Sequence, residues 1–376
     1  MSGIYFHIPF CRKACHYCDF HFSTQLSAKE RMVAALISEV NLSKDFITEK
    51  TVETIYFGGG TPSVLSAVEI TSLIAAVRTN FEVVAEPEIT LESNPDDLTP
   101  EYLVELKRAG INRLSIGIQS FFDDDLERMN RSHNAEQAKK CVQLAHAAGI
   151  SNITIDLIYG MPYMDEIKWK ENLQYALRLP VQHISSYCLT VENRTVLHHK
   201  VKQGEIPDVD EDMTLKHFEI LMEETAKKGF EHYEISNFAL PGFRSRHNSS
   251  YWWGKQYLGI GPSAHSYNES IRRWNLANNT RYLKAIEADE IPCEEEILTP
   301  KDKLNEYLLT RIRLTEGCNF KDMKLLYYNK LPEETEDKVD AFCLTGLLEK
   351  TDTGFRLTQK GKFRADGIAA ELFVTN

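Results

Sequence analysis

Three cysteines lie close together near the start of the chain, in the stretch HIPFCRKACHYCDF at 7–20. Cys11, Cys15 and Cys18 have the spacing C-x3-C-x2-C, and Phe20 stands where another thiol, two positions further on, would fall. An odd number of clustered thiols favours metal binding, because each disulfide needs two thiols. A zinc site would need a fourth ligand from a nearby histidine, whereas an iron–sulfur cluster on three thiolates would keep one iron open. The spacing alone leaves both kinds of site open.

Glycines and carboxylates that could bind a ligand follow further along the chain. The run GGGTPS at 58–63 could bring the backbone close to a ligand and present N–H groups, but it is equally typical of a tight strand–helix turn. Glu92 and Asp156 could accept hydrogen bonds from a ligand, although such carboxylates more often accept them from a helix N-terminus or an arginine. Their role depends on whether the fold brings them to the cysteines.

Regular alternation of strand and helix patterns would position these residues. Strands are expected at 3–8, 53–58, 88–92, 113–118, 152–158 and 182–189, and helices at 27–43, 66–79, 99–109, 134–148, 167–178 and 211–228. Strict alternation predicts a parallel sheet. Six such units predict an α/β fold with a partial (βα)6 TIM-like barrel, because a closed eightfold barrel takes about 250 residues.

Local signals at the helix ends agree with this alternation. Ser27 with Glu30 predicts a capping box, and Thr99 before Pro100 predicts a second helix N-terminus. Gly110 is expected just after the end of the third helix.

The carboxyl ends of the expected strands collect the unusual residues. The cysteines follow the first strand, GGGTPS follows the second, Glu92 and Gln119 end the third and fourth, and Asp156 lies in the fifth. Barrel enzymes build their sites on this face. Because zinc would account only for the cysteines, the arrangement favours an iron–sulfur cluster within a larger cofactor site.

Composition restricts the class of protein. The net charge of −12, from 43 basic and 55 acidic residues, opposes nonspecific nucleic-acid binding, so no nucleic-acid partner is expected. No run of about 18 apolar residues predicts a membrane span, and no secretory signal precedes the cysteines, so we expect a cytoplasmic protein. The remaining cysteines are interpreted as inert thiols of a reducing compartment: Cys141, Cys188, Cys293, Cys318 and Cys343.

The last 75 or so residues do not continue the alternation of strands and helices. Helices are expected at 302–314, 320–328 and 335–345, followed by a β-hairpin of 347–350 and 355–358. Helices followed by such a hairpin predict a winged-helix-like domain, to which we assign packing or partner docking. The predicted domains are a barrel at 1–235, a connecting region at 236–298 and a C-terminal domain at 299–376.

Several motifs in fixed order make the chain recognisable. The cysteine motif and GGGTP are followed by ESNPDDLT (92–99), GIQSF (117–121), NRSHN (130–134) and IDLIYGMP (155–162). This series resembles radical S-adenosylmethionine (SAM) proteins, in the branch that contains oxygen-independent coproporphyrinogen dehydrogenase and heme chaperones. The resemblance runs through most of the chain.

The resemblance implies a [4Fe-4S] cluster with SAM on its open iron. Cys11, Cys15 and Cys18 would hold the cluster, and the methionine amino group would lie against the glycine turn. Glu92 would accept hydrogen bonds from the ribose hydroxyls. The complete set of residues implied for SAM is Tyr5, Gly59, Gly60, Thr61, Glu92, Gln119, Arg131, Asp156 and Thr190.

Two features separate the sequence from the dehydrogenase. That enzyme resembles C-x3-C-x2-C-x-C at the cluster, and Phe20 replaces its last cysteine here. The dehydrogenase also carries a long segment before the cluster, which we expect to be absent because ten residues precede Cys11. Both features are typical of the heme chaperones.

A motif in the connecting region points in the same direction. His247, Asn248, Tyr251 and Trp252 match the H-N-x-x-Y-W pattern of the heme chaperones. An imidazole can ligate heme iron and aromatic rings can cover a porphyrin face, although chemistry alone would favour packing in the core for such a run. His265 is a second candidate ligand, for which a structural role is favoured.

The resemblance therefore implies a heme chaperone that binds heme and transfers it to apo-proteins, expected to be heme enzymes of the respiratory chain. Oxidative decarboxylation of coproporphyrinogen III by a radical SAM mechanism is the alternative, and a structural zinc protein is a third. A homodimer and peripheral membrane contact through the recipients are further expectations. Whether the chain is itself an enzyme stays open at this stage.

Overall fold

Six parallel strands form the centre of the computed structural model, which describes residues 1–375. The strands lie side by side in sequence order and pair in parallel throughout. No closed barrel forms among the described residues, so the predicted partial barrel is confirmed. The strands are β1 (Ser2–Ile8), β2 (Thr51–Gly59), β3 (Glu82–Ser93), β4 (Arg113–Gln119), β5 (Asn152–Tyr159) and β6 (His183–Cys188).

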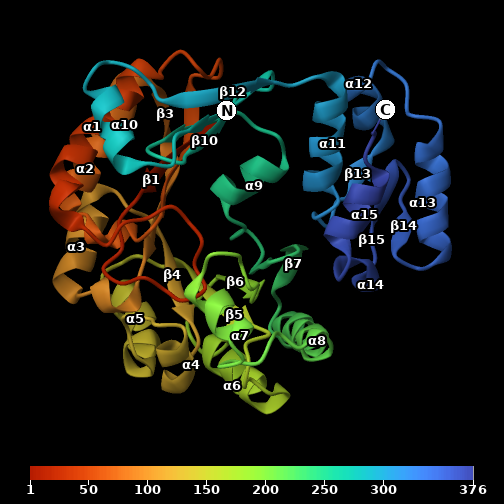
Figure 1. Cartoon of the computed structure of the whole chain (residues 1–376), viewed down its shortest axis with the longest axis horizontal. Coiled ribbons are helices and arrows are strands. Elements are labelled where there is room, and N and C mark those ends of the chain that lie inside the picture. Colours follow the sequence, from red (N-terminus) through yellow and green to blue (C-terminus); the bar gives the residue numbers. More distant parts are fainter. Residues whose placement is uncertain (376) are drawn as a thin grey trace.

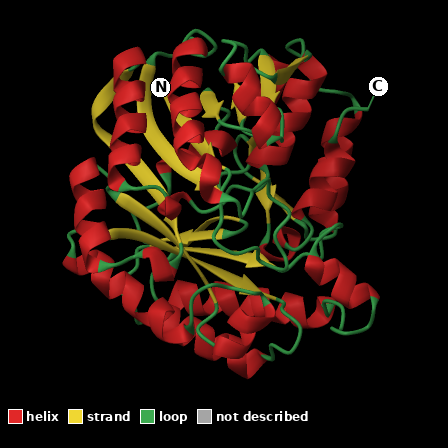
Figure 2. Ribbon diagram, turned by 60° about the vertical axis from the view of Figure 1, so that its left-hand side comes forward, coloured by secondary structure: helices red, strands yellow, loops and turns green. Residues whose placement is uncertain are grey.

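Helices lie around the outside of this curved sheet (Figure 2). Each predicted helix is present within a few residues of its expected ends. They are α1 (Lys29–Leu42), α2 (Ala67–Asn80), α3 (Pro100–Ala109), α5 (Ala135–Ala147), α6 (Glu166–Ala176) and α8 (Glu211–Lys227). The sequence patterns missed two shorter helices, α4 (Asp123–Arg128) and α7 (Val196–Lys202), and three 3-10 turns at Leu26–Ala28, Pro62–Val64 and Pro95–Asp97.

The helix ends follow local side-chain chemistry, with one correction. The Thr99 side chain accepts a hydrogen bond from the Tyr102 N–H, and Gly110 takes a φ of 99° after α3, as predicted. The capping box predicted at Ser27 is wrong, because Ser27 lies inside a 3-10 turn and α1 begins at Lys29 without a side-chain cap.

Short strands extend the sheet on both sides. At one edge, β8 (Asn237–Ala239) pairs antiparallel with β6, and β7 (Glu231–Glu234) pairs with β8. At the other edge the chain returns through α9 (Arg246–Trp252) to β9 (Tyr257–Ile260), which pairs in parallel with β1. Beyond it lie β10 (His265–Tyr267), β11 (Ile271–Asn275) and β12 (Cys293–Ile297), with α10 (Asn279–Ile286) between the last two.

The C-terminal part has a hydrophobic core of its own, built around Leu308, Met323, Val339 and Phe355. The predicted helices and hairpin are confirmed as α11 (Pro300–Arg311), α12 (Phe320–Leu326), α13 (Glu334–Leu344), β14 (Leu348–Lys350) and β15 (Gly354–Leu357). β13 (Cys318–Asn319), α14 (Gln359–Lys362) and α15 (Ala365–Leu372) complete it. This group stands beside the barrel, with α9 between them (Figure 1). Among residues 1–375, no helix combines the length and apolar character needed to cross a membrane.

Candidate functional site

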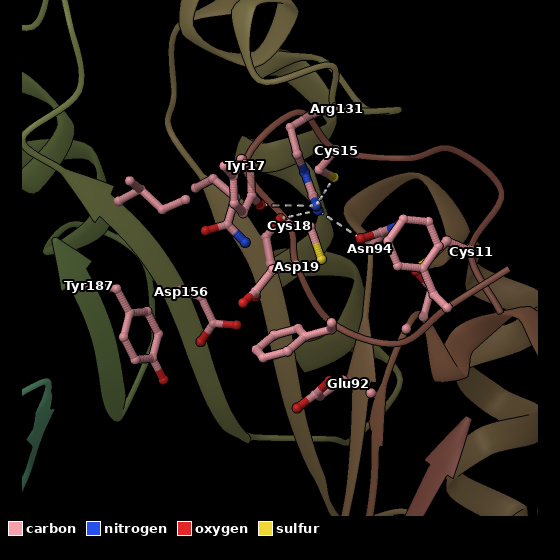
Figure 3. Close-up of a pocket in the computed structure, with 18 of the residues that line it drawn as sticks. Cys11, Cys15, Tyr17, Cys18, Asp19, Glu92, Asn94, Arg131, Asp156 and Tyr187 are labelled. Carbon is pink, nitrogen blue, oxygen red and sulfur yellow. Dashed lines mark hydrogen bonds between the residues drawn. The ribbon is translucent and has the colours of Figure 1, made fainter. Parts of the chain in front are cut away.

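A cavity of about 440 Å³ opens at the carboxyl ends of β1–β6. Parallel strands end at the same edge of a sheet, which is why residues far apart in sequence meet there. The three clustered cysteines line this cavity, together with all the residues predicted for SAM except Tyr5: Gly59, Gly60, Thr61, Glu92, Gln119, Arg131, Asp156 and Thr190. Figure 3 shows part of this lining.

The glycine turn after β2 holds the cysteine loop against the sheet. The Gly60 N–H donates to the Ile8 carbonyl at 2.9 Å, and the Thr61 N–H donates to the Phe10 carbonyl at 2.7 Å. A Cβ on Gly60 would lie 2.6 Å from the Phe10 oxygen, so no side chain fits between the turn and the loop. Two N–H groups that the sequence offered to a ligand are therefore used by the chain itself, while the same turn still borders the cavity.

Arg131 ties the cysteine loop to the sheet from the opposite side. Its Nη1 donates to Cys15 Sγ at 3.2 Å, and its Nη2 donates to Asn94 Oδ1 at 2.7 Å and to the Gly117 carbonyl at 2.8 Å (Figure 3). The neighbouring Asn130 also donates to the Ala14 carbonyl at 2.7 Å. The NRSHN motif thus fixes the position of the second cysteine.

The donors around the thiols suit thiolate ligands. Thr61 Oγ1 donates to Cys11 Sγ at 3.3 Å, which adds to the Arg131 contact with Cys15. Burial raises the pKa of Cys18 to about 11, so an apolar surrounding alone would keep this thiol protonated and a bound cation is needed to deprotonate it. Among residues 1–375, no three His, Cys, Asp or Glu side chains lie close enough together to hold a single metal ion. A four-iron cluster does not require such convergence, because each thiolate binds a different iron, so the donor set fits a cluster.

Two partly buried carboxyl groups point into the cavity, Glu92 from β3 and Asp156 from β5 (Figure 3). Burial raises the pKa of Glu92 to about 8, although the Tyr56 hydroxyl donates to its Oε1 at 2.8 Å. Burial also raises the pKa of Asp156 to about 6, and Ser115 Oγ lies 3.4 Å from both of its carboxyl oxygens. The two groups supply hydrogen-bond acceptors to the cavity that the cysteines and the glycine turn also line.

Tyr5 lies below the cavity and does not line it. Its ring stacks near Tyr56, with centroids 6.1 Å apart, and its hydroxyl lies 3.3 Å from His7 Nδ1. A Cβ on Gly58 would lie 2.9 Å from the Tyr5 ring. Tyr5 therefore supports the strand end beneath the glycine turn.

His247 is enclosed at the opposite end of the barrel, away from the cavity. Its side chain is 1% exposed, its Nδ1 lies 2.7 Å from Thr54 Oγ1 and its Nε2 lies 2.8 Å from the Tyr251 hydroxyl. Its backbone N–H donates to Glu88 at 3.0 Å. Both ring nitrogens are thus occupied, and heme ligation by His247 stays a prediction that would require one of these bonds to open.

The other predicted heme residues, Asn248 and Trp252, lie on the same helix α9 and are partly exposed. The guanidinium of Arg313 lies 5.6 Å from the Trp252 ring, and that of Arg311 lies 3.7 Å from Trp253. The aromatic motif therefore contacts the C-terminal group. His265, in β10, is exposed.

Several residues of the cavity were not singled out from the sequence: Tyr17, Asn94, Ser115, Gly117, Tyr187 and Cys188. Asn94 follows Glu92 by two positions, and Ser115 and Gly117 precede Gln119 at the same spacing. A period of two marks side chains on one face of a strand, so this signal could have identified them. The thiol of Cys188 carried no comparable signal, because it stands alone in an apolar run.

Residues 5–176 match the radical SAM superfamily, and residues 298–364 match the HemN C-terminal domain. The chain is 35% identical to the heme chaperone HemW of Lactococcus lactis, over 98% of both chains. The chain belongs to the HemW family of radical SAM proteins.

Other relatives extend this family assignment. The heme chaperone HemW of Escherichia coli is 31% identical over 99% of this chain and 98% of its own. The solved structure of coproporphyrinogen III oxidase (HemN) from Escherichia coli superposes with a TM-score of 0.87, covering 99% of this chain and 90% of that one. Its sequence identity is 21%, so this likeness shows a shared fold alone.

Proposed function

We propose that the chain is a heme chaperone, which binds heme and transfers it to apo-proteins. The observation that carries this proposal is full-length similarity of 31–35% identity to heme chaperones of several bacteria. The cavity supports the cofactor part of the proposal, because it gathers the cysteines and the residues expected around SAM in one place.

When bound, a [4Fe-4S] cluster would supply an iron open to SAM and able to donate an electron. Cys11, Cys15 and Cys18 would hold the cluster, and Arg131 would orient Cys15 through its contact with the sulfur. Glu92 would accept hydrogen bonds from the ribose hydroxyls of SAM. Gly59, Gly60 and Thr61 would line the methionine end, and Gln119, Asp156 and Thr190 would enclose the remainder.

For heme, we propose the α9 motif as the contact region, with His247 as the iron ligand once its bond to Tyr251 opens. The recipients would be respiratory heme enzymes, reached from the cytoplasm through peripheral membrane contact with them. We also propose that the chain forms a homodimer. Size measurements with and without heme, and capture of heme by a purified apo-enzyme, test these details.

Coproporphyrinogen dehydrogenation is not favoured as the function. Phe20 stands where the dehydrogenase motif has a further cysteine, and its side chain is 68% exposed and borders the cavity. The relatives covered over their full length are heme chaperones.

Anaerobic reconstitution with iron and sulfide tests the cluster. Each single change Cys11→Ala, Cys15→Ala or Cys18→Ala should abolish the charge-transfer absorption of a four-iron cluster, because each thiolate holds a separate iron. Cys293→Ala is the matched control, since Cys293 lies on β12 outside the cavity. A normal cluster in two of the three variants would refute the assignment.

A second experiment separates the chaperone from the dehydrogenase. The reconstituted wild-type protein is titrated with heme, and in parallel it is incubated with coproporphyrinogen III, SAM and a reductant. We expect heme binding with a Soret band, heme transfer to an apo-enzyme and no protoporphyrinogen. Turnover to protoporphyrinogen without heme transfer would favour the alternative.

A further inference from the structure

A groove runs between the barrel and the C-terminal group, with α8 on one side and α13–α15 on the other (Figure 1). Its volume of about 980 Å³ is more than twice that of the cofactor cavity. A space of this size suits an organic ligand rather than a metal ion. Both walls carry apolar side chains, Val209 and Leu215 on the barrel side and Ala341, Phe342, Leu347 and Phe363 on the side of the C-terminal group.

The groove begins at the rim of the cofactor cavity. Cys188, at the end of β6, lines both spaces. Its strand neighbour Tyr159 stacks on Phe218 of α8, with ring centroids 5.9 Å apart. The Phe218 ring in turn lies 5.2 Å from that of Phe363, in the C-terminal group. A ligand in the groove would therefore contact both parts of the chain and lie beside the site proposed for the cluster and SAM.

Two cations of the C-terminal group line this groove without an anionic partner. Lys360 and Arg364 are exposed, and within residues 1–375 neither forms an ion pair. Lys360 Nζ donates only to the Thr345 carbonyl, at 3.4 Å. Lys338, the third cation of the lining, differs because it pairs with Glu334 at 2.8 Å. Two positive charges beside an apolar wall are thus free to bind the carboxylates of a ligand.

The acidic residues of the lining leave these two cations free. Glu211 and Glu219 belong to α8 and Glu371 to α15, and none of them pairs with Lys360 or Arg364. Apolar walls with separate cations suit a flat apolar molecule that carries carboxylates on one edge, which is the chemistry of heme with its two propionates.

The lining also offers one ligand for heme iron. Among the described residues that border the groove, Cys188 is the only cysteine, histidine, methionine or tyrosine. Thiolates of cysteine ligate heme iron in other proteins, and a metal ion deprotonates the thiol that it binds.

We propose that this groove is a heme site, in addition to the α9 motif. The apolar walls cover the porphyrin faces, Lys360 and Arg364 bind the propionates, and Cys188 ligates the iron as a thiolate after its proton passes to solvent. This inference rests on the proposed chaperone function and adds a binding site to it. His247 is 1% exposed and bonded at both ring nitrogens, whereas heme in the groove can leave without opening a buried hydrogen bond. The groove therefore suits the transfer step.

The first test identifies the iron ligand. Ferric heme is added to the reconstituted protein, in which the cluster occupies the three motif cysteines, and the electron paramagnetic resonance spectrum is recorded. The wild type should show a signal of thiolate-ligated heme, which Cys188→Ser should lose and His247→Ala should keep. Cys141→Ser is the matched control, because Cys141 is a buried thiol of α5 outside the groove. Absence of the thiolate signal from the wild type, or its persistence in Cys188→Ser, would overturn the inference.

The second test follows the same signal while the protein is titrated with heme or with heme dimethyl ester, in which both propionates are blocked. The double variant Lys360→Gln/Arg364→Gln should bind heme about tenfold more weakly than the wild type, because two charge-assisted contacts are lost. The ester should bind both proteins equally. Lys321→Gln/Arg281→Gln is the matched control, since both residues are exposed and lie outside the groove. Equal heme affinity in the double variant and the wild type, or an equal loss for heme and ester, would overturn the inference.

The inference and the proposed function can fail separately. A wild-type protein that binds no heme at all would overturn the chaperone function. Heme binding and transfer that depend neither on Cys188 nor on the propionates would overturn the groove site alone.

Discussion

Polar side chains, rather than branched apolar ones, fill much of the barrel beneath the cavity. Thr54 Oγ1 lies 2.7 Å from His247 Nδ1, and Thr154 Oγ1 lies 2.6 Å from His183 Nδ1. Each histidine then meets a tyrosine hydroxyl at 2.8 Å through its Nε2. Barrel interiors are usually packed with valine, isoleucine and leucine. These two hydrogen-bonded series of threonine, histidine and tyrosine side chains therefore distinguish the interior of this barrel.

The enclosed position of His247 changes what its removal should do. His247→Ala should cost about 2–4 kcal/mol of unfolding free energy, because it empties a buried site and strands two hydrogen-bond partners. Tyr251→Phe removes one hydroxyl, which should cost about 1–3 kcal/mol and free Nε2 for a ligand. If His247 ligates heme, Tyr251→Phe should bind heme at least as tightly as the wild type, and His247→Ala should bind it more weakly.

Heme titration and urea denaturation of both variants separate ligation from packing. The Soret band reports the iron ligand, while the unfolding free energy reports the lost contacts. An unchanged Soret band and affinity in folded His247→Ala would contradict ligation by this imidazole. His265, which is exposed on β10, is then the next ligand to change.

At the scale of elements, the cysteine loop is held by the turns that surround it. The Cys11 N–H donates to the Ser23 carbonyl at 3.0 Å, which closes the loop on itself. The glycine turn after β2 and the loop before α5 then fix it to the sheet from two sides. The spacing of the cysteines therefore suits a cluster only because the cysteine loop, the glycine turn after β2 and the loop before α5 meet at the same edge of the sheet.

Gly60→Ala tests this dependence. A Cβ there would meet the backbone oxygens of Phe10 and Ile8 at 2.6 and 2.9 Å, and backbone atoms cannot move aside without shifting the loop. The variant should lose about 1–3 kcal/mol of stability and most of its cluster content after reconstitution. Gly367→Ala is the control, since a Cβ on Gly367 meets nothing within 4 Å. Iron and sulfide content per folded protein decides the outcome, and a full cluster in Gly60→Ala would show that the loop tolerates displacement.

The elements of the barrel could be predicted because each strand carries a run of apolar residues that packs against the helices. Leu114, Ile116 and Ile118, for example, are buried on one face of β4. The short strands β7–β12 that flank the central six could not be predicted, because they are three to five residues long and carry too few residues for a clear pattern. The predicted capping box at Ser27 is wrong because a 3-10 turn takes the place of the first turn of α1.

Some residues of the candidate site could likewise be predicted from the sequence, and others could not. Glu92 could be placed at the cavity from strand order, whereas Arg131, which precedes α5, could be placed there only through the family resemblance. The position of Tyr5 below the cavity and the burial of His247 could not be predicted, because a motif does not show which face of the sheet its side chains occupy.

At the scale of the whole molecule, the barrel and the C-terminal group meet along β7. The Thr315 N–H donates to the Tyr233 carbonyl at 3.1 Å, which continues the backbone pairing of that sheet edge. Lys362 from α14 reaches into the same contact and places its Nζ 2.9 Å from His232 Nδ1. A partly buried lysine thus lies between two parts of the chain that each have their own core.

Lys362 should make the junction weaker at neutral pH than at alkaline pH. Burial lowers its pKa to about 8, below the ordinary value of a lysine, although Glu234 nearby opposes the shift. Between about pH 8 and the ordinary lysine pKa of about 10.4, the unfolded chain holds a proton that the folded chain has lost, so this group's contribution to stability rises with pH in that window. Below about pH 8 the folded protein carries the full cost of a buried charge.

Lys362→Met should therefore be more stable than the wild type at pH 7. Its free energy of unfolding, measured by urea denaturation, should be about 1–2 kcal/mol higher after allowance for partial exposure. This difference should disappear as the pH rises from about 8 to about 10.4. Lys360→Met, which changes an exposed lysine on the same helix, should show no such pH-dependent gain. Loss of stability in Lys362→Met at every pH would mean that the hydrogen bond to His232 outweighs the cost of burying the charge.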